Sequence, residues 1–196
     1  MMPPRTDIQL WIDLEATGSG DDEEIVEVGL SLVETENWTE MGSYSHLVEP
    51  SKAAWARMEA NAAVMRLHNS NGLYDDLVRM REMQPGRYTI DYIDGEVEQW
   101  IKSYVGSNTT HIPLGGSGVL HYDRKFIKRD MPRLDQRLTY WALDVGVPRR
   151  HFQIFGIPWL AADDGGGKTH RALDDARYHF REFMFFRDFL LKATGK

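Results

Sequence analysis

The chain has 196 residues, of which 42% are hydrophobic, and it carries a formal net charge of −7 and no cysteine. The length and apolar content predict one globular domain over residues 1–196, with a short flexible N-terminus at residues 1–6. The absence of cysteine excludes disulfides, zinc–thiolate sites and a cysteine nucleophile, and the acidic balance argues against a protein that coats nucleic acid by bulk charge.

The N-terminus, Met1-Met2-Pro3-Pro4-Arg5, lacks the basic start and apolar run of a signal peptide. No stretch of about 18 apolar residues occurs in the chain, so we expect no membrane span. The lack of cysteine fits a cytoplasmic location, which we take as the expectation.

The first predicted element is a strand at residues 8–15, in which apolar side chains alternate with Gln, Trp, Asp and Glu. A strand has a side-chain period of two, so Asp13 and Glu15 project from the same face. Thr17-Gly18 ends the strand and places both acids at its open end. Neighbouring carboxylates repel each other, and a hard divalent ion, Mg²⁺ or Mn²⁺, is their natural partner. The alternative is a solvated strand end with two surface acids.

The other predicted strands show how the sheet is organised. Residues 24–33 and 42–48 follow the first strand after short connections, which predicts an antiparallel meander. Residues 111–116 form a short buried strand that leads into a glycine-rich turn, and residues 139–145 form an edge strand. A parallel strand added after a long helical excursion predicts an α/β fold, with a mixed sheet covered by helices.

Helical periodicity predicts helices at residues 53–67, 72–81, 89–105, 120–129 and 171–192. Residues 146–158 are irregular by composition, and residues 163–168 form a flexible loop around Gly165-Gly166-Gly167. Such a loop would let the segment before the last helix close over a substrate, although an ordinary surface loop explains the glycines as well. The core-facing stripe of the last helix is predicted to be Leu173, Ala176, Phe180, Phe183, Phe186 and Leu190.

Further polar residues stand in settings that suggest chemistry. Asp123 follows the glycine-rich turn and begins a basic segment that contains Arg124, Lys125, Lys128, Arg129, Arg133 and Arg137. His170 and Asp174-Asp175 lie at the start of the last helix. Each has a bland alternative, as a helix-start acid, a capping or surface histidine, or a solvated first turn.

Taken in order along the chain, these residues resemble the DEDDh family of 3′-to-5′ exonucleases, and within it the oligoribonuclease branch. The likeness runs from Ile8 to Leu190. It is carried by Ile12-Asp13-x-Glu15-x-Thr17-Gly18, Leu67-His68-x-x-x-Gly72-Leu73, Asp123-Arg124-Lys125-Phe126 with Met131-Pro132-x-Leu134, Tyr140 with Leu143-Asp144-Val145, and His170-x-Ala172-x-Asp174-Asp175. The resemblance implies an RNase H-like exonuclease fold, with a five-stranded mixed sheet flanked by helices.

The same resemblance implies that His170 is the general base and that four carboxylates hold two divalent ions, Mg²⁺ or Mn²⁺: those of Asp13, Glu15, Asp123 and Asp175. Two ions about 4 Å apart would offset the charge that develops on a phosphodiester under attack. Histidine has a reference pKa near neutrality, which suits a base. The family spacing from His170 selects Asp175 over Asp174, a choice that the residues by themselves leave open.

The expected substrates are short single-stranded RNA, or DNA, oligonucleotides, cleaved to 5′-mononucleotides. The backbone of Leu14 and Ala16 flanks the acids and is expected close to the terminal nucleotide, and Arg124, Lys125, Lys128 and Arg129 are candidate phosphate contacts. By resemblance, His68 matches a histidine beside the nucleotide pocket, and Ser117 is a candidate ligand for the phosphate end. Tyr140 matches a tyrosine that in oligoribonucleases reaches into the partner subunit's active site, which implies a homodimer. The bland alternatives are a lone helical histidine, a solvated basic helix face and an edge-strand aromatic residue.

Two departures from the family pattern bear on substrate length. Ser19 stands where oligoribonucleases have Leu, and Ala63 stands where they have Trp. Those two apolar groups wedge and stack the bases of a very short substrate. Candidates that would replace them are Trp55, Met58 and Met65.

The segment at residues 113–123 is also one residue longer than the family pattern, and residues 146–148 depart from the helix expected there. A second hypothesis is therefore a DEDDh exonuclease of broader range on longer single-stranded DNA or RNA, which Ser19 and Ala63 favour. A third is a nucleic-acid-binding module that has lost catalysis. The five chemical positions all carry the right residue types, which argues against this third hypothesis.

Overall fold

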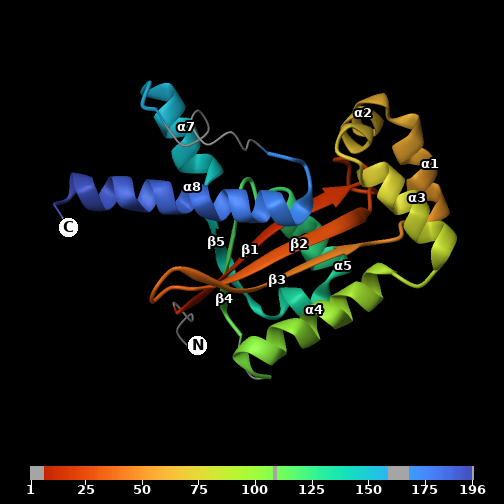
Figure 1. The fold of residues 1–196 in the computed structure, drawn as a ribbon, viewed down its shortest axis with the longest axis horizontal. Coiled ribbons are helices and arrows are strands. Elements are labelled where there is room, and N and C mark those ends of the chain that lie inside the picture. The colour runs from red at the N-terminus through yellow and green to blue at the C-terminus, as the bar shows by residue number, and fades with distance from the viewer. Residues whose placement is uncertain (1–6, 108–109, 159–167, 196) are drawn as a thin grey trace.

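The computed structural model describes residues 7–107, 110–158 and 168–195. Its strands are β1 (Ile8–Ala16), β2 (Ile25–Glu34), β3 (Thr39–Leu47), β4 (Ile112–Gly116) and β5 (Leu138–Asp144). They form one sheet in the order β3-β2-β1-β4-β5 (Figure 1). The β1–β2 and β2–β3 pairs are antiparallel, whereas the β1–β4 and β4–β5 pairs are parallel. The predicted meander and mixed sheet are confirmed.

Helices cover both faces of this sheet. The described helices are α1 (Lys52–Ala60), α2 (Ala62–Ser70), α3 (Leu73–Met83), α4 (Ile90–Val105), α5 (Asp123–Asp130), α6 (Pro132–Asp135), α7 (Gly146–Ile154) and α8 (Ala172–Ala193). Figure 1 shows α8 running across the strands, α4 on the opposite side of the sheet, and α1 to α3 grouped together at one end. The expected arrangement, a mixed sheet flanked by helices, is therefore present.

The alternation in β1 sends its residues into two different cores. Leu10, Ile12 and Leu14 are buried on one face, against side chains of α4, α5 and α6 that include Ile93, Val97, Ile101, Phe126, Ile127 and Leu134. Trp11 lies on the other face, where its ring contacts Phe180 and Phe183 of α8 at centroid distances of 5.6 and 5.2 Å. Asp13 and Glu15 have the parity of Trp11, so they project toward α8.

A glycine lets α8 approach the sheet closely beside these acids. Gly29 of β2 pairs with Asp13 of β1. A Cβ at position 29 would lie 2.1 Å from the backbone of Ala172 and Leu173, far inside van der Waals contact. Any larger residue at this position would push the first turn of α8 away from the acids.

One predicted helix and one segment predicted to be irregular differ from the structure. The segment at residues 53–67 is two helices, because Asn61 between them is extended and its side chain accepts hydrogen bonds from Ala63 N–H and Val64 N–H. Residues 146–158 are not wholly irregular, since α7 forms there. Pro148 lies in the first turn of α7, where its missing N–H costs no helical hydrogen bond.

The predicted core stripe of α8 is also only partly correct. Phe186 is buried, but Leu190 is 62% exposed. The buried face of the helix includes Asp175, His179 and Glu182 instead. The helix is thus rotated so that polar side chains, rather than an uninterrupted apolar stripe, meet the centre of the sheet.

Within the described ranges, none of the helices is both long and apolar enough to cross a bilayer. The predicted flexible N-terminus at residues 1–6 and the glycine run at residues 165–167 lie outside those ranges.

Candidate active site

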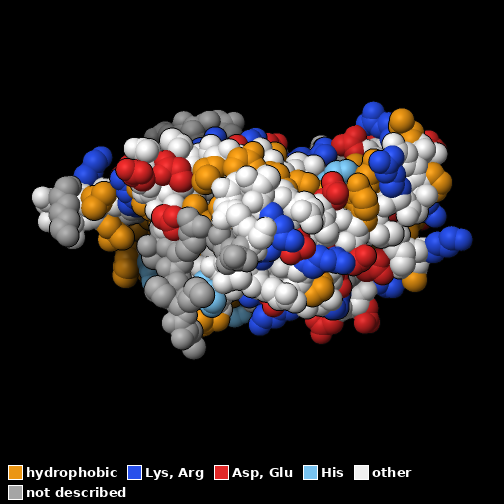
Figure 2. Space-filling view, turned by 90° about the horizontal axis from the view of Figure 1, so that it is seen from below, with side chains coloured by type: hydrophobic (Ala, Val, Ile, Leu, Met, Phe, Trp, Pro, Cys, Tyr) orange, Lys and Arg blue, Asp and Glu red, His pale blue; other side chains and the backbone are white. Residues whose placement is uncertain are grey.

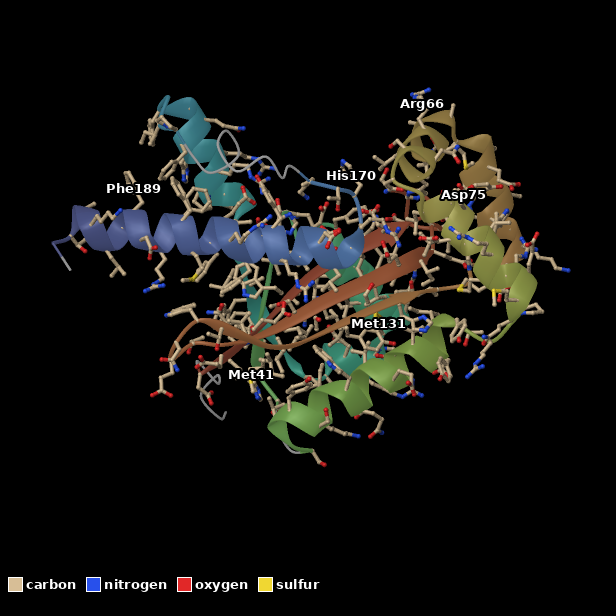
Figure 3. All side chains as sticks on the ribbon, in the orientation of Figure 1. Met41, Arg66, Asp75, Met131, His170 and Phe189 are labelled. Atoms are coloured by element: carbon tan, nitrogen blue, oxygen red, sulfur yellow. The ribbon has the colours of Figure 1, made fainter. Side chains whose placement is uncertain are left out.

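Three side chains from distant parts of the chain meet at the end of β1. One ligand atom each of Glu15, His170 and Asp175 lies within 4.8 Å of the other two. Glu15 is near the end of β1, Asp175 is in the first turns of α8, and His170 is in the bend just before that helix. Figure 3 shows His170 on the segment that leads into α8. The structure therefore brings together three of the five residues expected to carry the chemistry.

The other two acids, Asp123 and Asp13, adjoin this group. Asp123, the first residue of α5, accepts a hydrogen bond at Oδ1 from Leu14 N–H at 3.0 Å, so its carboxyl lies against β1. Asp13 Oδ1 is 3.9 Å from Lys168 Nζ and 3.8 Å from His179 Nδ1. All four predicted carboxylates therefore gather around the end of one strand.

Burial disfavours the ionised forms of Asp13, Glu15 and Asp123, and repulsion from neighbouring carboxylates adds to this effect at Asp13 and Glu15. Glu15, Asp123 and Asp175 are 8%, 3% and 1% exposed. Burial and the Asp123 charge raise the pKa of Asp13 well above its usual value, and burial and the Asp175 charge raise the pKa of Glu15 to about 8. Burial raises the pKa of Asp123 to about 7. Clustered carboxylate oxygens are the donors that Mg²⁺ and Mn²⁺ prefer, and a cation would remove the repulsion, so the donor set fits a divalent ion.

The start of α8 is held in place by Glu27 of β2. The buried Glu27 carboxylate accepts from Arg171 Nη2 at 2.9 Å and from Ala172 N–H at 3.0 Å. Asn71 donates its side-chain amide to the His170 carbonyl, and His170 has a φ of 54°, uncommon for a residue with a Cβ. Contacts on both sides therefore fix the bend that carries His170.

The structure separates Asp174 from Asp175. Asp175 is buried, and its Oδ1 accepts a hydrogen bond from Thr169 N–H at 2.9 Å. Asp174 is exposed to solvent. Asp175 is the member of the pair that joins Glu15 and His170.

The predicted substrate contacts at the strand end are engaged within the protein. His68 is buried and donates from Nε2 to the Ala16 carbonyl at 3.0 Å, while the Leu14 N–H donates to Asp123. Burial lowers the pKa of His68. These three residues lie beside the acids, and their contact with a substrate stays a prediction.

Two other predicted substrate residues lie beyond β4 and on β5. Ser117 follows β4, and its Oγ accepts from Arg149 Nη1 of α7 at 3.1 Å. Arg149 is in turn paired with the buried Glu182 of α8. Tyr140 is on the edge strand β5 and is 88% exposed. A role of Ser117 and Tyr140 in substrate binding stays a prediction.

The prediction for Arg124 as a phosphate contact is wrong. Its side chain is buried, donates from Nη1 to the Thr139 carbonyl at 3.0 Å and pairs with Asp135 at 2.9 Å. Its basic neighbours Lys125 and Arg129 bind carbonyls of the β1–β2 connection, including that of Ser19 at 2.8 Å. Acidic and basic side chains are interspersed on the face in Figure 2. Lys125 and Arg129 therefore stabilise the connection between β1 and β2.

Two of the proposed replacements for the missing base-stacking groups are also excluded. Trp55 and Met58 are buried with Leu73 and Leu77 in a separate core between α1 and α3. Met65 is partly buried against that core. Trp55 and Met58 therefore hold the helices together and are not available to stack on a base.

Sequence reasoning missed three residues of the site. Glu27 has the same parity as Gly29 and pairs with Glu15 in the strand register, so strand alternation had placed it on the correct face. His179 lies four residues after Asp175, the spacing that puts two side chains on one helix face. Lys168 carries no local signal, because it lies outside any helix or strand.

The comparisons with known proteins agree with this geometry. The exonuclease family model RNase_T matches residues 10–183. Oligoribonucleases of Nocardia farcinica and Pseudomonas syringae pv. tomato are 30% and 31% identical to the chain, covering 91% and 93% of it and 78% and 96% of their own lengths.

Solved structures show the fold. The nuclease domain of 3'hExo, a DEDDh family member bound to rAMP, superposes with a TM-score of 0.53 at 19% identity, over 95% of each chain. Exonuclease I from Methylocaldum szegediense gives 0.61 at 13% identity, over 92% of this chain and 40% of that one. The fold is therefore the expected RNase H-like exonuclease fold.

Proposed function

The chain belongs to the exonuclease family, whose model spans residues 10–183, and on that premise we propose a specific reaction for this 3′-to-5′ exonuclease. It hydrolyses short single-stranded oligonucleotides, RNA in the first place, to 5′-mononucleotides. It does so with two divalent metal ions, Mg²⁺ or Mn²⁺. The similarity to oligoribonucleases over almost the whole chain supports this substrate class.

The observation that supports the proposal most directly is the convergence at the end of β1. Glu15, His170 and Asp175 come within 4.8 Å of one another, and Asp13 and Asp123 adjoin them. Asp13, Glu15 and Asp123 have raised pKa values, and a buried group of carboxylates is unfavourable without a cation. In this proposal the ions are held by those four acids, Asp13, Glu15, Asp123 and Asp175.

Asp13, Glu15, Asp123 and Asp175 would hold the divalent ions, which would supply positive charge at the scissile phosphate and make the attacking water more acidic. A ring nitrogen of His170 takes a proton from that water. His170 is exposed and lies beside Glu15 and Asp175, a position that suits this role. The new bond joins the water oxygen to phosphorus, and the bond from phosphorus to the 3′ oxygen of the shortened strand breaks. The fixed bend at His170 keeps the imidazole near Glu15 and Asp175 before substrate binds.

The terminal nucleotide would lie along the end of β1. The backbone of Leu14 and Ala16 flanks the acids there, and His68 lies against Ala16. Ser117 follows β4, the parallel neighbour of β1, and stays a candidate ligand for the phosphate end of the substrate.

We also propose that the active unit is a homodimer, with a second copy of this chain seated on the β5 edge. Tyr140 is on this unpaired edge strand and projects into solvent. Next to it, a mainly apolar cavity of about 700 Å³ is lined by β5, α7 and α8, with Leu143, Pro148, Phe186 and Leu190 among the lining residues. An unpaired edge beside apolar surface is a favourable place for a self-complementary contact. The cytoplasmic location and the single-domain organisation also stay predictions.

The substrate range is tested by a length series, in which hydrolysis of RNA and DNA is measured from dinucleotides to oligomers of about 24 nucleotides. The proposal expects the highest kcat/KM on the shortest RNA substrates. Equal rates at all lengths would instead support the broader exonuclease that the exposed Ala63 and Ser19 positions favour. Tight binding without turnover in Mg²⁺ would support the non-catalytic module.

A further inference from the structure

His179 is a fully buried histidine on the helix face that meets the candidate active site. It lies four residues after Asp175 on α8, so the two side chains share one face of the helix. Asp175 lies next to Glu15 and His170, and His179 lies next to the remaining strand acid, with Nδ1 3.8 Å from Asp13 Oδ1. His179 is 0% exposed.

Apart from Asp13, no contact within the described part of the chain accounts for a polar ring at this position. Among the residues that the structure describes, neither ring nitrogen of His179 has a hydrogen-bond partner. A buried polar group without a partner destabilises the folded protein, whereas leucine would fill the same space without that cost. Glu182, the next buried polar residue on this face, directs both carboxylate oxygens to Arg149. Asp13 is therefore the acceptor within reach.

Two groups approach the same oxygen of Asp13. His179 Nδ1 lies 3.8 Å and Lys168 Nζ lies 3.9 Å from Asp13 Oδ1. An imidazole carries at least one ring N–H whether it is neutral or charged, so His179 has a donor to offer to Asp13.

We propose that His179 is a positioning residue, which donates a hydrogen bond from Nδ1 to Asp13 Oδ1 and so orients the carboxylate for metal binding. This role rests on the proposed function. A hydrogen bond requires a separation of about 2.7–3.2 Å, so the two groups must approach by less than about 1 Å from their present distance. Donors behind a metal ligand fix its orientation and strengthen its hold on the ion.

The test measures Mn²⁺ binding to the substrate-free protein by calorimetry, so that it does not depend on activity. His179→Leu removes the donor and keeps the volume, and we expect it to weaken Mn²⁺ binding about tenfold or more. His179→Asn places an amide N–H near the position of Nδ1 and is expected to stay within about threefold of wild type. Phe152→Leu, a buried change on α7 where it packs against α8, is the control for lost packing and should leave the affinity unchanged.

Wild-type Mn²⁺ affinity in a folded His179→Leu protein would overturn the proposal. If that variant does not fold, nitrogen NMR of the wild-type imidazole decides: an unprotonated Nδ1 in the Mg²⁺-bound protein overturns it, and a hydrogen-bonded Nδ1–H supports it. Asp13→Asn separates the two levels of the argument. If Asp13→Asn binds Mn²⁺ as tightly as the wild type, the proposed function itself is contradicted. If Asp13→Asn abolishes Mn²⁺ binding but His179→Leu leaves it intact, only the role of His179 is contradicted.

Discussion

Glu15 and Glu27 face each other across the β1–β2 pair, and among the described residues Glu27 forms an ion pair, with Arg171, whereas Glu15 forms none. The Glu27 carboxylate binds Arg171 and the first N–H of α8. Burial, followed by the charges of Asp175 and Glu27, raises the pKa of Glu15 to about 8. One acid therefore anchors the helix that carries Asp175, and the other is left to bind a cation.

Replacing the anchor should damage both stability and activity. Glu27→Gln keeps the shape of the side chain but removes the charge that pairs with Arg171 and stabilises the start of α8. We expect a loss of about 1–3 kcal/mol in the free energy of unfolding, the range for a hydrogen-bonded charge, measured by urea denaturation. We also expect kcat to fall by more than the loss of folded protein explains. His170 precedes Arg171 and Asp175 follows it in the first turns of α8, so a displaced helix start moves both side chains.

Glu40→Gln is the matched control for this change. Glu40 also pairs with an arginine of α8, Arg177, through two contacts of 2.7 and 2.8 Å, but Glu40 is exposed. Exposed ion pairs contribute about 0–1 kcal/mol, so this variant should unfold near the wild-type midpoint and keep its activity. Equal losses in the two variants would show that Glu27 has no special role at the site.

Neighbouring aspartates should differ sharply in their effect on turnover. Asp175→Asn removes the buried carboxylate next to Glu15 and His170, and we expect kcat to fall by about three orders of magnitude or more with the fold retained. Asp174→Asn changes an exposed residue and should stay within about twofold of wild type. The measurement is release of mononucleotide from an end-labelled dinucleotide in Mg²⁺. A larger effect at Asp174 would reverse the assignment.

The metal-free protein should lose stability as the pH rises. The folded-state pKa of Glu15 is about 8 against a usual value of 4.5, and that of Asp123 is about 7 against 3.8. Between its unfolded and folded pKa values, each group in the folded protein holds a proton that the unfolded chain has released. The stabilising contribution of these protons is complete below pH 3.8 and is lost by about pH 8.

Urea unfolding in a chelator at about pH 5 and about pH 8.5 measures this dependence. Saturating Mg²⁺ should flatten it, because the ion stabilises the ionised carboxylates. Glu15→Gln should make it shallower in the metal-free protein. A metal-free stability that rises over this interval would contradict the clustering of buried acids.

Mixing two inactive variants should restore activity if Tyr140 acts across a dimer. In Tyr140→Ala each active site would lack the partner's tyrosine, and in Asp13→Ala each would lack its own acid. A mixed dimer combines Asp13 from one subunit with Tyr140 from the other in one of its two sites. Random exchange of subunits should therefore recover about a quarter of the wild-type activity, measured on a dinucleotide. No recovery after proven subunit exchange would exclude the shared site.

Local patterns located most of the secondary structure. Alternation in β1 and β2 predicted both strands and the face of Asp13 and Glu15, since a strand's period is a property of its own backbone. The helix at residues 146–154 was missed because Gly146 and Pro148 lower helical propensity, and tertiary contacts outweigh propensity in so short a segment. Asp144 contributes to them by accepting hydrogen bonds from the Gly118 and Gly146 N–H groups.

The roles of individual polar residues were harder to predict. Arg124 follows Asp123 in the sequence, yet a helix turns neighbouring side chains about 100° apart, and the Arg124 guanidinium meets Asp135 instead. The apolar residues of α8 predicted its buried face only in part. His179 is buried beside Asp13 of β1, and Glu182 is buried in its ion pair with Arg149 of α7.

The sequence by itself determined the sheet strands, the residue types at the five chemical positions and their order along the chain, because these follow from local periodicity and from resemblance to a family. Only the tertiary structure decided which atoms meet. The buried position of Asp175 agrees with the choice over Asp174 that the family spacing indicated, whereas Glu27 and His179 join the site because the contact at Gly29 and the ion pair with Arg171 set the height and rotation of α8 over β1. Those quantities depend on contacts between residues far apart in the chain, which local sequence patterns do not encode.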